Sequence, residues 1–273
     1  MSEATDRLLR LMERLRDPLN GCEWDRAQSF ETIVPHTIEE AYEVADAVAR
    51  GDIAAIKDEL GDLLFQVVFQ ARIAEEAGLF DFAAVADAIT GKLIARHPHI
   101  FAAEALDDAP RDERWERIKA AERASQGATS ALDGVALALP ALLRAEKLQK
   151  RAARVGFDWP DVAGPAAKVA EELAELAEAH SDAHRAEEAG DLLFATVNLV
   201  RAYGIAPEEA LRAANAKFER RFRAMEVRAT VQGIDFSELS LDQQDALWRD
   251  VKTSEALSKS GKPPEVTLGQ ADS

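Results

Sequence analysis

The chain has 273 residues, 47% of them hydrophobic, which is enough to bury the core of two modest domains or one large domain. A formal net charge of −17 argues against a surface that neutralises the phosphates of nucleic acid. The single cysteine, Cys22, excludes an intrachain disulfide and indicates a reducing compartment, where we expect it to be a small packing residue.

Membrane segments are not expected from the sequence. Charged residues interrupt the apolar pattern at the N-terminus, which predicts an amphipathic helix rather than a secretory signal. The most apolar stretch, residues 135–143, contains Pro140 and is far shorter than the roughly 20 residues needed to span a bilayer. We therefore expect a cytoplasmic protein that binds neither membrane nor nucleic acid.

Helical periodicity runs through nearly every long segment, and Ala, Leu, Glu and Arg are frequent, so the sequence predicts an all-α fold. The predicted helices span residues 4–16, 38–50, 53–77, 82–97, 111–124, 141–154, 165–180, 183–203, 207–230 and 241–252. Predicted capping boxes pair Thr37 with Glu40 and Ser240 with Gln243. Helix ends are predicted at Gly51 and Gly78, and Pro207 suits a first helical position.

A segment of linker-like composition near the middle divides the chain. Residues 125–134 are rich in Ser, Gly, Ala and Thr, which is the composition of a linker. We therefore predict an N-terminal helical domain over residues 1–125, a linker over 126–140, a C-terminal helical domain over 141–253 and a disordered tail over 254–273.

Four sequence blocks occur twice in the same order, which predicts a tandem repeat. The first-half blocks are Glu39-Glu40-Ala-Tyr-Glu43, Glu59-Leu-Gly-Asp62-Leu-Leu-Phe65, Lys92-Leu-Ile-Ala-Arg96 and Trp115-Glu-Arg-Ile-Lys119. Their second-half counterparts are Glu171-Glu172-Leu-Ala-Glu175, Glu188-Ala-Gly-Asp191-Leu-Leu-Phe194, Lys217-Phe-Glu-Arg-Arg221 and Trp248-Arg-Asp-Val-Lys252.

Each half places two carboxylates three residues apart on one predicted helix and two more on the next, so each pair shares a helical face. The two sets are Glu40, Glu43, Glu59 and Asp62, and Glu172, Glu175, Glu188 and Asp191. Glu43 and Glu59 lie eight residues on either side of Gly51, and Glu40 and Asp62 lie eleven residues on either side of it. The second set is symmetric about residues 181–182 in the same way. An antiparallel hairpin would therefore bring four carboxylates to one level twice.

Such a cluster needs a cation, because unneutralised carboxylates on facing helices repel one another. Oxygen ligands select hard ions, so we expect Mg²⁺ or Mn²⁺, and Mg²⁺ commonly shares its coordination with substrate phosphates. The alternative is an ordinary solvated acidic face, with Glu40 closing a cap. Two observations argue against a solvated face: Asp62 and Asp191 lie among apolar residues, and Gly61 and Gly190 sit mid-helix at a cost of about 1 kcal/mol each. Close packing or the approach of a metal would explain both placements.

Cations and tryptophans follow the carboxylates in both halves. Lys217 and Arg221 share a helical face, and Lys252 follows Trp248 by four residues, so these groups are candidates for binding phosphates and stacking on a base. The first half offers Lys92, Arg96, Trp115 and Lys119 in the same order. The alternative for each is a surface salt bridge or a core tryptophan. His97-Pro98-His99 lacks zinc-ligand partners and is interpreted as a loop.

With both carboxylate sets in place, the chain resembles the MazG family of nucleoside triphosphate pyrophosphohydrolases, whose signature is EExxE followed by ExxD. The likeness covers about residues 5–253 and includes Gly21-Cys-Glu-Trp-Asp25 with Gln28, where Glu23 replaces the usual proline, and Lys92 through Phe101. The resemblance implies an all-α bundle, generally a homodimer, that converts nucleoside triphosphates to monophosphates and pyrophosphate.

The resemblance also implies roles for the residues named above. Glu172, Glu175, Glu188 and Asp191 would hold Mg²⁺, and Lys217, Arg221 and Lys252 would neutralise the departing pyrophosphate. Trp248 or a nearby apolar wall would hold the base. The same roles map onto the first half, and the extra charge of Arg220 and Arg221 favours the second. Alternatives are a narrower dUTP, dCTP or phosphoribosyl-ATP pyrophosphatase, or a non-catalytic scaffold that binds metal or nucleotide.

Overall fold

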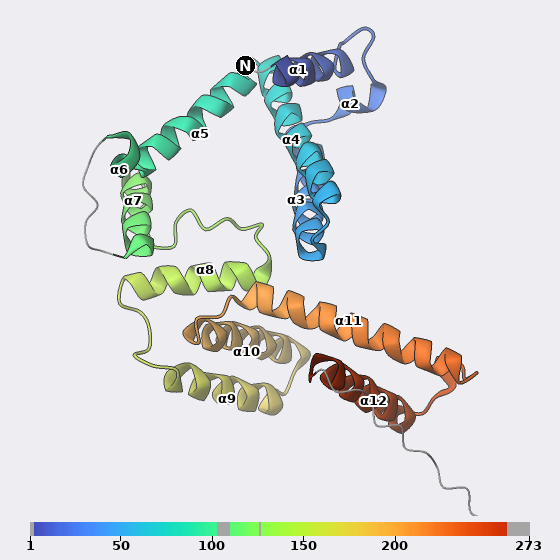
Figure 1. Ribbon diagram of the computed structural model, residues 1–273. Coiled ribbons are helices and arrows are strands. Elements are labelled where there is room, and N and C mark those ends of the chain that lie inside the picture. The colour runs from blue at the N-terminus through green and yellow to red at the C-terminus, as the bar shows by residue number, and fades with distance from the viewer. Residues whose placement is uncertain (1–2, 103–109, 126, 261–273) are drawn as a thin grey trace, which may run out of the picture. The chain divides into compact units, whose positions relative to one another are not determined.

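The computed structural model describes residues 3–102, 110–125 and 127–260, which form helices and no strands (Figure 1). The helices are α1 (Glu3–Leu15), α2 (Glu23–Ala27), α3 (Phe30–Arg50), α4 (Ile53–Glu76), α5 (Phe82–Arg96), α6 (Pro98–Phe101), α7 (Arg111–Ser125), α8 (Ala141–Arg154), α9 (Ala163–Glu178), α10 (Asp182–Ala202), α11 (Pro207–Val231), the 3₁₀ helix η1 (Phe236–Glu238) and α12 (Leu241–Ser260). The predicted all-α class is confirmed. Within these residues, none of the helices is long and apolar enough to cross a membrane.

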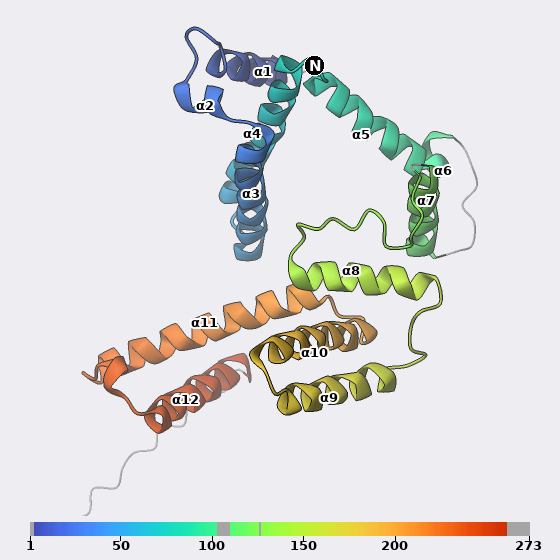
Figure 2. The ribbon, with the colours of Figure 1, turned by 180° about the vertical axis from the view of Figure 1, so that it is seen from behind.

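The chain divides into two compact units, residues 1–119 and 120–273. Each unit contains a long antiparallel helical hairpin, formed by α3 and α4 in the first and by α9 and α10 in the second. Figures 1 and 2 show the two helices of each hairpin side by side from opposite directions. The tandem arrangement predicted from the repeat is therefore present.

The first hairpin begins earlier than the sequence predicts. The hydroxyl of Ser29 accepts from the backbone of Thr32 and the Thr32 side chain accepts in return, so this capping box starts α3. The predicted cap at Thr37 is wrong, since Thr37 lies inside the helix and donates to the carbonyl of Ile33. Pro35 lies inside α3, where it costs one helical hydrogen bond, yet the helix continues through it.

The core of the first unit lies at the C-terminal end of α4. Phe69 is fully buried there and packs with Met12 of α1 and Ile33 of α3. Arg16, which follows α1, stacks over the Phe69 ring and binds Glu76 through both carboxylate oxygens. These contacts join α1 to α4 and leave the half of the hairpin nearer its turn for the carboxylates.

In the second unit, α10 packs against α8 as well as α9, and α11 packs against α12. A small core of Met225, Ala229, Leu247 and Val251 joins the last two helices. The segment before α8, predicted as a linker, is held to that helix because Arg151 donates to the carbonyls of Ala131 and Asp133.

Several local predictions are confirmed. Gly51 and Gly78 follow α3 and α4 with φ of 68°, Pro207 begins α11, and Ser240 and Gln243 exchange the two bonds of a capping box. Others are wrong. Cys22 is exposed rather than packed, Pro98 begins the short helix α6 where a loop was predicted, and α2 was not predicted.

The last helix is also longer than predicted. It continues to Ser260, although its predicted end is residue 252 and the predicted tail starts at residue 254. The remainder of that tail, residues 261–273, lies outside the described residues.

Candidate active site

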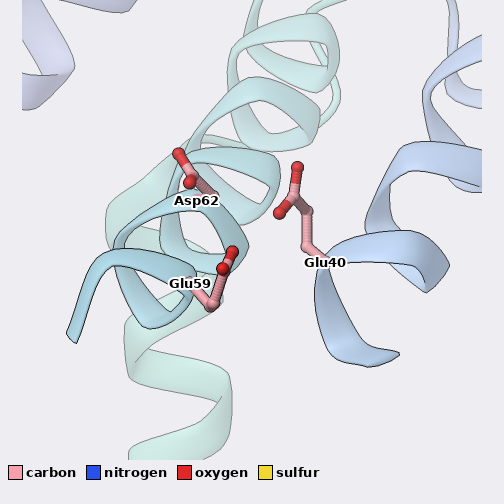
Figure 3. A group of neighbouring side chains, drawn as sticks. All are labelled: Glu40, Glu59 and Asp62. Atoms are coloured by element: carbon pink, nitrogen blue, oxygen red, sulfur yellow. The ribbon is translucent and has the colours of Figure 1, made fainter. Parts of the chain in front are cut away.

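The first carboxylate cluster lies across the hairpin of α3 and α4. Glu40 on α3 faces Glu59 and Asp62 on α4, as Figure 3 shows, and one carboxylate oxygen of each lies within 4.8 Å of the others. Asp52 fixes the start of α4 by accepting from the backbone of Ala54 and Ala55. This cap sets the register that brings the three carboxylates together.

The electrostatics of this cluster indicate crowded negative charge. Burial raises the pKa of Glu40, and the charges of Asp62 and Glu43 raise it further. Burial likewise raises the pKa of Glu59, with Glu43 and Asp62 adding to the shift. Glu43 is exposed and lies outside the group of Glu40, Glu59 and Asp62. Its charge nevertheless contributes to the raised pKa of both Glu40 and Glu59, so it lies near them. Nearby negative charges favour a bound cation.

The second cluster repeats the arrangement on α9 and α10. Glu172 is 4% exposed, and its carboxylate lies within 4.8 Å of those of Glu188 and Asp191. Glu175 is exposed and belongs to a separate group with Glu171 and Glu172. Burial raises the pKa of Glu175, followed by the charges of Glu172 and Glu188. The carboxylates of all four predicted metal residues therefore lie close to one another in the second half as well.

Two basic side chains distinguish the second cluster. The Lys168 ammonium lies 2.8 Å from Glu171 and 2.5 Å from Glu172, and Nε2 of His184 lies 2.9 Å from Glu188. Hydrogen bonds to the two glutamates raise the pKa of Lys168, so it is charged at neutral pH. The sequence reasoning missed Lys168, although it lies one helical turn before Glu172.

Two of the three predicted cations of the first unit lie against a tryptophan ring. The guanidinium of Arg96 lies 5.3 Å from the ring centre of Trp115, and the ammonium of Lys119 lies 5.2 Å from it. His97 adds a further ring contact at 5.4 Å. Lys92 is exposed on α5. Arg96, Trp115 and Lys119 therefore come together as a group.

In the second unit, Arg221 lies over the ring of Trp248 at 5.5 Å. Its Nε also donates to Glu255 at 2.8 Å, a carboxylate partner that the sequence did not reveal. Lys217 and Lys252 are exposed. Arg221 thus contacts α12 rather than the carboxylates of α9 and α10.

A pocket of about 600 Å³ adjoins the second cluster. Its lining includes Glu172, Lys168 and Asp191 together with Phe157 and Trp159, which precede α9. The sequence reasoning did not single out Trp159. A signal was present, since Gly21-Cys-Glu-Trp24 recurs as Gly156-Phe-Asp-Trp159, a fifth block of the repeat.

The two mid-helix glycines do not pack closely within the chain. A Cβ added at Gly61 or Gly190 would have no neighbouring atom within 4 Å. Close packing within the unit, one of the two explanations offered by the sequence, is therefore wrong for both positions. Approach of a metal or substrate remains the explanation to test.

Comparison with known proteins agrees with this geometry. Residues 28–101 match the model of the MazG nucleotide pyrophosphohydrolase domain, and residues 146–218 match that of phosphoribosyl-ATP pyrophosphohydrolase. The nucleoside triphosphate pyrophosphohydrolase of Escherichia coli K12 is 50% identical over 92% of this chain and 97% of its own length. The nucleoside triphosphate pyrophosphohydrolase/pyrophosphatase MazG of Thermotoga maritima is 42% identical over 90% and 95%.

A solved structure, a mazG-related protein from Thermotoga maritima, has 29% sequence identity and a TM-score of 0.36, covering 42% of this chain and 98% of that one. The tandem carboxylate hairpins and the sequence matches define an all-α pyrophosphohydrolase. The chain belongs to the MazG family, as the sequence resemblance predicted, and is an enzyme of that class.

Proposed function

We propose that this enzyme hydrolyses nucleoside triphosphates to nucleoside monophosphates and pyrophosphate, and that the C-terminal half performs the reaction. The observation that carries this assignment is the pocket of about 600 Å³ whose lining includes Glu172 and Asp191. Pockets of a few hundred Å³ that combine apolar walls with a few charged groups are typical of small-molecule sites. The names of the relatives support the same substrate class.

The carboxylates of this half fit a hard divalent cation. Glu172, Glu188 and Asp191 offer three oxygens within 4.8 Å of one another, and Glu175 adds a fourth carboxylate nearby. All-oxygen sets suit Mg²⁺, with Mn²⁺ as a substitute. When bound, the ion would offset the charge of the triphosphate and make the attacking water more acidic.

The reaction joins a water oxygen to the α-phosphorus while the bond from that phosphorus to the α–β bridging oxygen breaks. We assign Glu175 as the general base that accepts the proton of the attacking water. It is exposed and lies outside the group formed by Glu172, Glu188 and Asp191. Lys217, Arg221 and Lys252 neutralise the departing pyrophosphate, and Trp248 flanks the nucleotide. Arg221 would exchange Glu255 for a phosphate oxygen.

The N-terminal half keeps a related set of groups. We assign Glu40, Glu43, Glu59 and Asp62 as its metal residues, supported by the close carboxylates of Glu40, Glu59 and Asp62. We assign Lys92, Arg96, Trp115 and Lys119 to the nucleotide, supported by the contacts of Arg96 and Lys119 with the Trp115 ring. We propose that this copy binds a divalent cation but contributes less to turnover.

The test is Mg²⁺-dependent release of pyrophosphate. Glu172→Gln, which removes charge with little change in shape, should lower kcat by roughly 100-fold or more, a size usual for loss of transition-state stabilisation. Glu178→Gln, at an exposed site on the same helix, is the matched control and should retain the rate. Glu40→Gln should cost far less than Glu172→Gln, and the reverse order would move the chemistry to the N-terminal half.

The match of residues 146–218 to phosphoribosyl-ATP pyrophosphohydrolase favours one narrower alternative. A panel of NTPs, dNTPs and phosphoribosyl-ATP separates the possibilities. Release from several nucleoside triphosphates supports the broad activity, whereas release from phosphoribosyl-ATP alone, or from dUTP or dCTP alone, supports a narrow one.

A homodimer and a cytoplasmic location stay predictions. Large apolar side chains such as Leu173 and Leu193, which are 58% and 61% exposed on the second hairpin, support association of two copies. Light scattering after size-exclusion chromatography tests the dimer directly.

A further inference from the structure

The group of cations on α11 and α12 includes one carboxylate, that of Glu255. The two helices lie side by side in Figures 1 and 2. Nε of Arg221 donates to Oε2 of Glu255 at 2.8 Å, while its guanidinium lies over the ring of Trp248. Glu255 follows Trp248 by seven residues, which places both on the same face of α12. The guanidinium that we assign to the departing pyrophosphate is therefore already held by an anion of the protein.

A second arginine holds the other oxygen of this carboxylate. Nε of Arg220 donates to Oε1 of Glu255 at 3.1 Å. The hydrogen bond from Arg221 lowers the pKa of Glu255 against the opposing effect of burial, and the bond from Arg220 lowers it further. Glu255 is therefore an anion at neutral pH. Because each arginine binds a different oxygen, the loss of one bond leaves the other in place.

The first half of the chain carries only part of this arrangement. Seven residues after its tryptophan it has Glu122, the counterpart of Glu255, so the glutamate recurs in the repeat. Ala95, however, stands where the second half has Arg220. The second arginine is thus a feature of the half that we propose to perform the reaction.

The geometry makes the bond between Arg221 and Glu255 the easier one to exchange for a ligand. The side chains of this pair are 18% and 22% exposed, so either charge would be costly to leave uncompensated. A phosphate oxygen that replaces Glu255 compensates Arg221, whose guanidinium can stay over the Trp248 ring. The bond to Arg220 continues to compensate Glu255. Neither charge is stranded by the exchange.

We propose that Glu255 is a positioning residue that competes with phosphate for Arg221, an inference that rests on the proposed function. In the free enzyme Glu255 holds the guanidinium over Trp248. When a nucleoside triphosphate binds, a phosphate oxygen takes the place of Glu255, which keeps its bond to Arg220. After cleavage Glu255 takes Arg221 back and so favours the release of pyrophosphate. Because either ligand must displace the same contact, Glu255 lowers the affinity for triphosphate and pyrophosphate alike.

The test follows monophosphate formation in Mg²⁺ from the nucleoside triphosphate that the wild type cleaves fastest, with and without added inorganic pyrophosphate. Glu255→Gln keeps the shape of the side chain but removes its charge. It should lower both KM for the triphosphate and the inhibition constant of pyrophosphate by roughly fivefold, the order of one partly exposed ion pair. A loss of folded structure alone would not tighten the binding of both ligands.

Glu219→Gln is the matched control. Glu219 precedes Arg220 on α11 and pairs with Arg223 at 2.5 Å, so the change removes one carboxylate charge from the same region. It leaves the bond between Arg221 and Glu255 in place. Both constants should therefore stay at their wild-type values.

A second variant, Arg220→Met, should act in the opposite direction. Without Arg220 it costs Glu255 more to give up Arg221, so KM and the inhibition constant should both rise by roughly threefold. In the double variant Arg220→Met/Glu255→Gln both constants should equal those of Glu255→Gln, because Arg220 acts only through the carboxylate.

Three results would overturn the proposal. A higher KM for Glu255→Gln would show that the carboxylate prepares Arg221 for phosphate instead of competing with it. Unchanged constants would show that Glu255 does neither. Weaker binding in the double variant than in Glu255→Gln would mean that Arg220 meets the phosphates directly. If the wild type forms no monophosphate from any nucleotide, the proposed function itself fails.

Discussion

Phe69 and Asn198 stand at the same position of an internal repeat, yet the phenylalanine is fully buried in a core and the asparagine lines a pocket beside carboxylates. At this position the two halves, which share their acidic motif, differ by an aromatic ring in place of an amide. The two halves therefore share the carboxylate hairpin but differ in the side chains that lie beside it.

The first prediction concerns the position of Trp159. A Cβ at Gly164 would lie 2.0 Å from Cδ1 and 2.5 Å from Cγ of the Trp159 ring, so Gly164→Ala must displace the indole. We expect KM for nucleoside triphosphate to rise by roughly tenfold, in line with the ~1–3 kcal/mol of one stacked base. Steady-state kinetics measure this, and near-ultraviolet circular dichroism should report the moved ring. An unchanged KM would show that Trp159 does not contact the substrate.

The second prediction concerns the mid-helix glycines. Because a Cβ at Gly61 or Gly190 meets no atom of its unit, replacement by alanine should stabilise α4 or α10 by up to about 1 kcal/mol. Urea unfolding measures the gain. If Gly190→Ala raises stability but lowers pyrophosphate release, a ligand or a second copy approaches this face; a loss of stability would contradict the open space seen around the residue.

The third prediction concerns Lys168. In the absence of metal its ammonium, 2.5 Å from the buried carboxylate of Glu172, offsets that charge. Lys168→Met should therefore lower the melting temperature in EDTA by roughly 2–4 °C more than it does in saturating Mg²⁺, where the cation takes over the role. Thermal unfolding under both conditions measures the difference.

Lys150→Met is the matched control, because Lys150 pairs with buried Glu146 at 2.6 Å with the same spacing and away from the cluster. Its effect should not depend on Mg²⁺. Equal shifts for Lys168→Met in both buffers would argue against metal at this cluster.

The fourth prediction concerns acid stability of the first unit. Burial opposes ionisation of Glu76, but hydrogen bonds from Arg16 and Arg72 outweigh it and lower the pKa below the ordinary 4.5. The group therefore contributes stability that is present above its unfolded pKa and is lost as pH falls through the lower folded value. Glu76→Gln should reduce the free energy of unfolding by about 1 kcal/mol at neutral pH.

The difference between wild type and Glu76→Gln should shrink as pH falls below 4.5, because the protonated acid resembles the amide. Urea unfolding at several pH values follows it. A difference that stays constant down to about pH 3 would show that Arg16 and Arg72 do not depend on the charge of Glu76.

Local signals determined the features that the sequence predicted correctly. Helical periodicity and the stop at Gly51 specify the first hairpin, and the spacing of Glu40, Glu59 and Asp62 then places their carboxylates together. The prediction at Thr37 was wrong because α3 begins eight residues earlier, where Ser29 caps it together with Thr32 rather than with an acidic residue.

The pocket was decided only by the tertiary structure. Gln149, Trp159 and Asn198 lie on three different segments, and nothing in their local sequence relates the α8 amide to the carbonyl of Phe194 on α10. The sequence alone determined the long helices of the hairpins, the repeat and the carboxylates, because those depend on contacts within a hairpin, whereas it missed the short helices α2 and α6. The shape of this pocket depends on side-chain volume where α8, α9 and α10 meet, and that is fixed only when the helices pack.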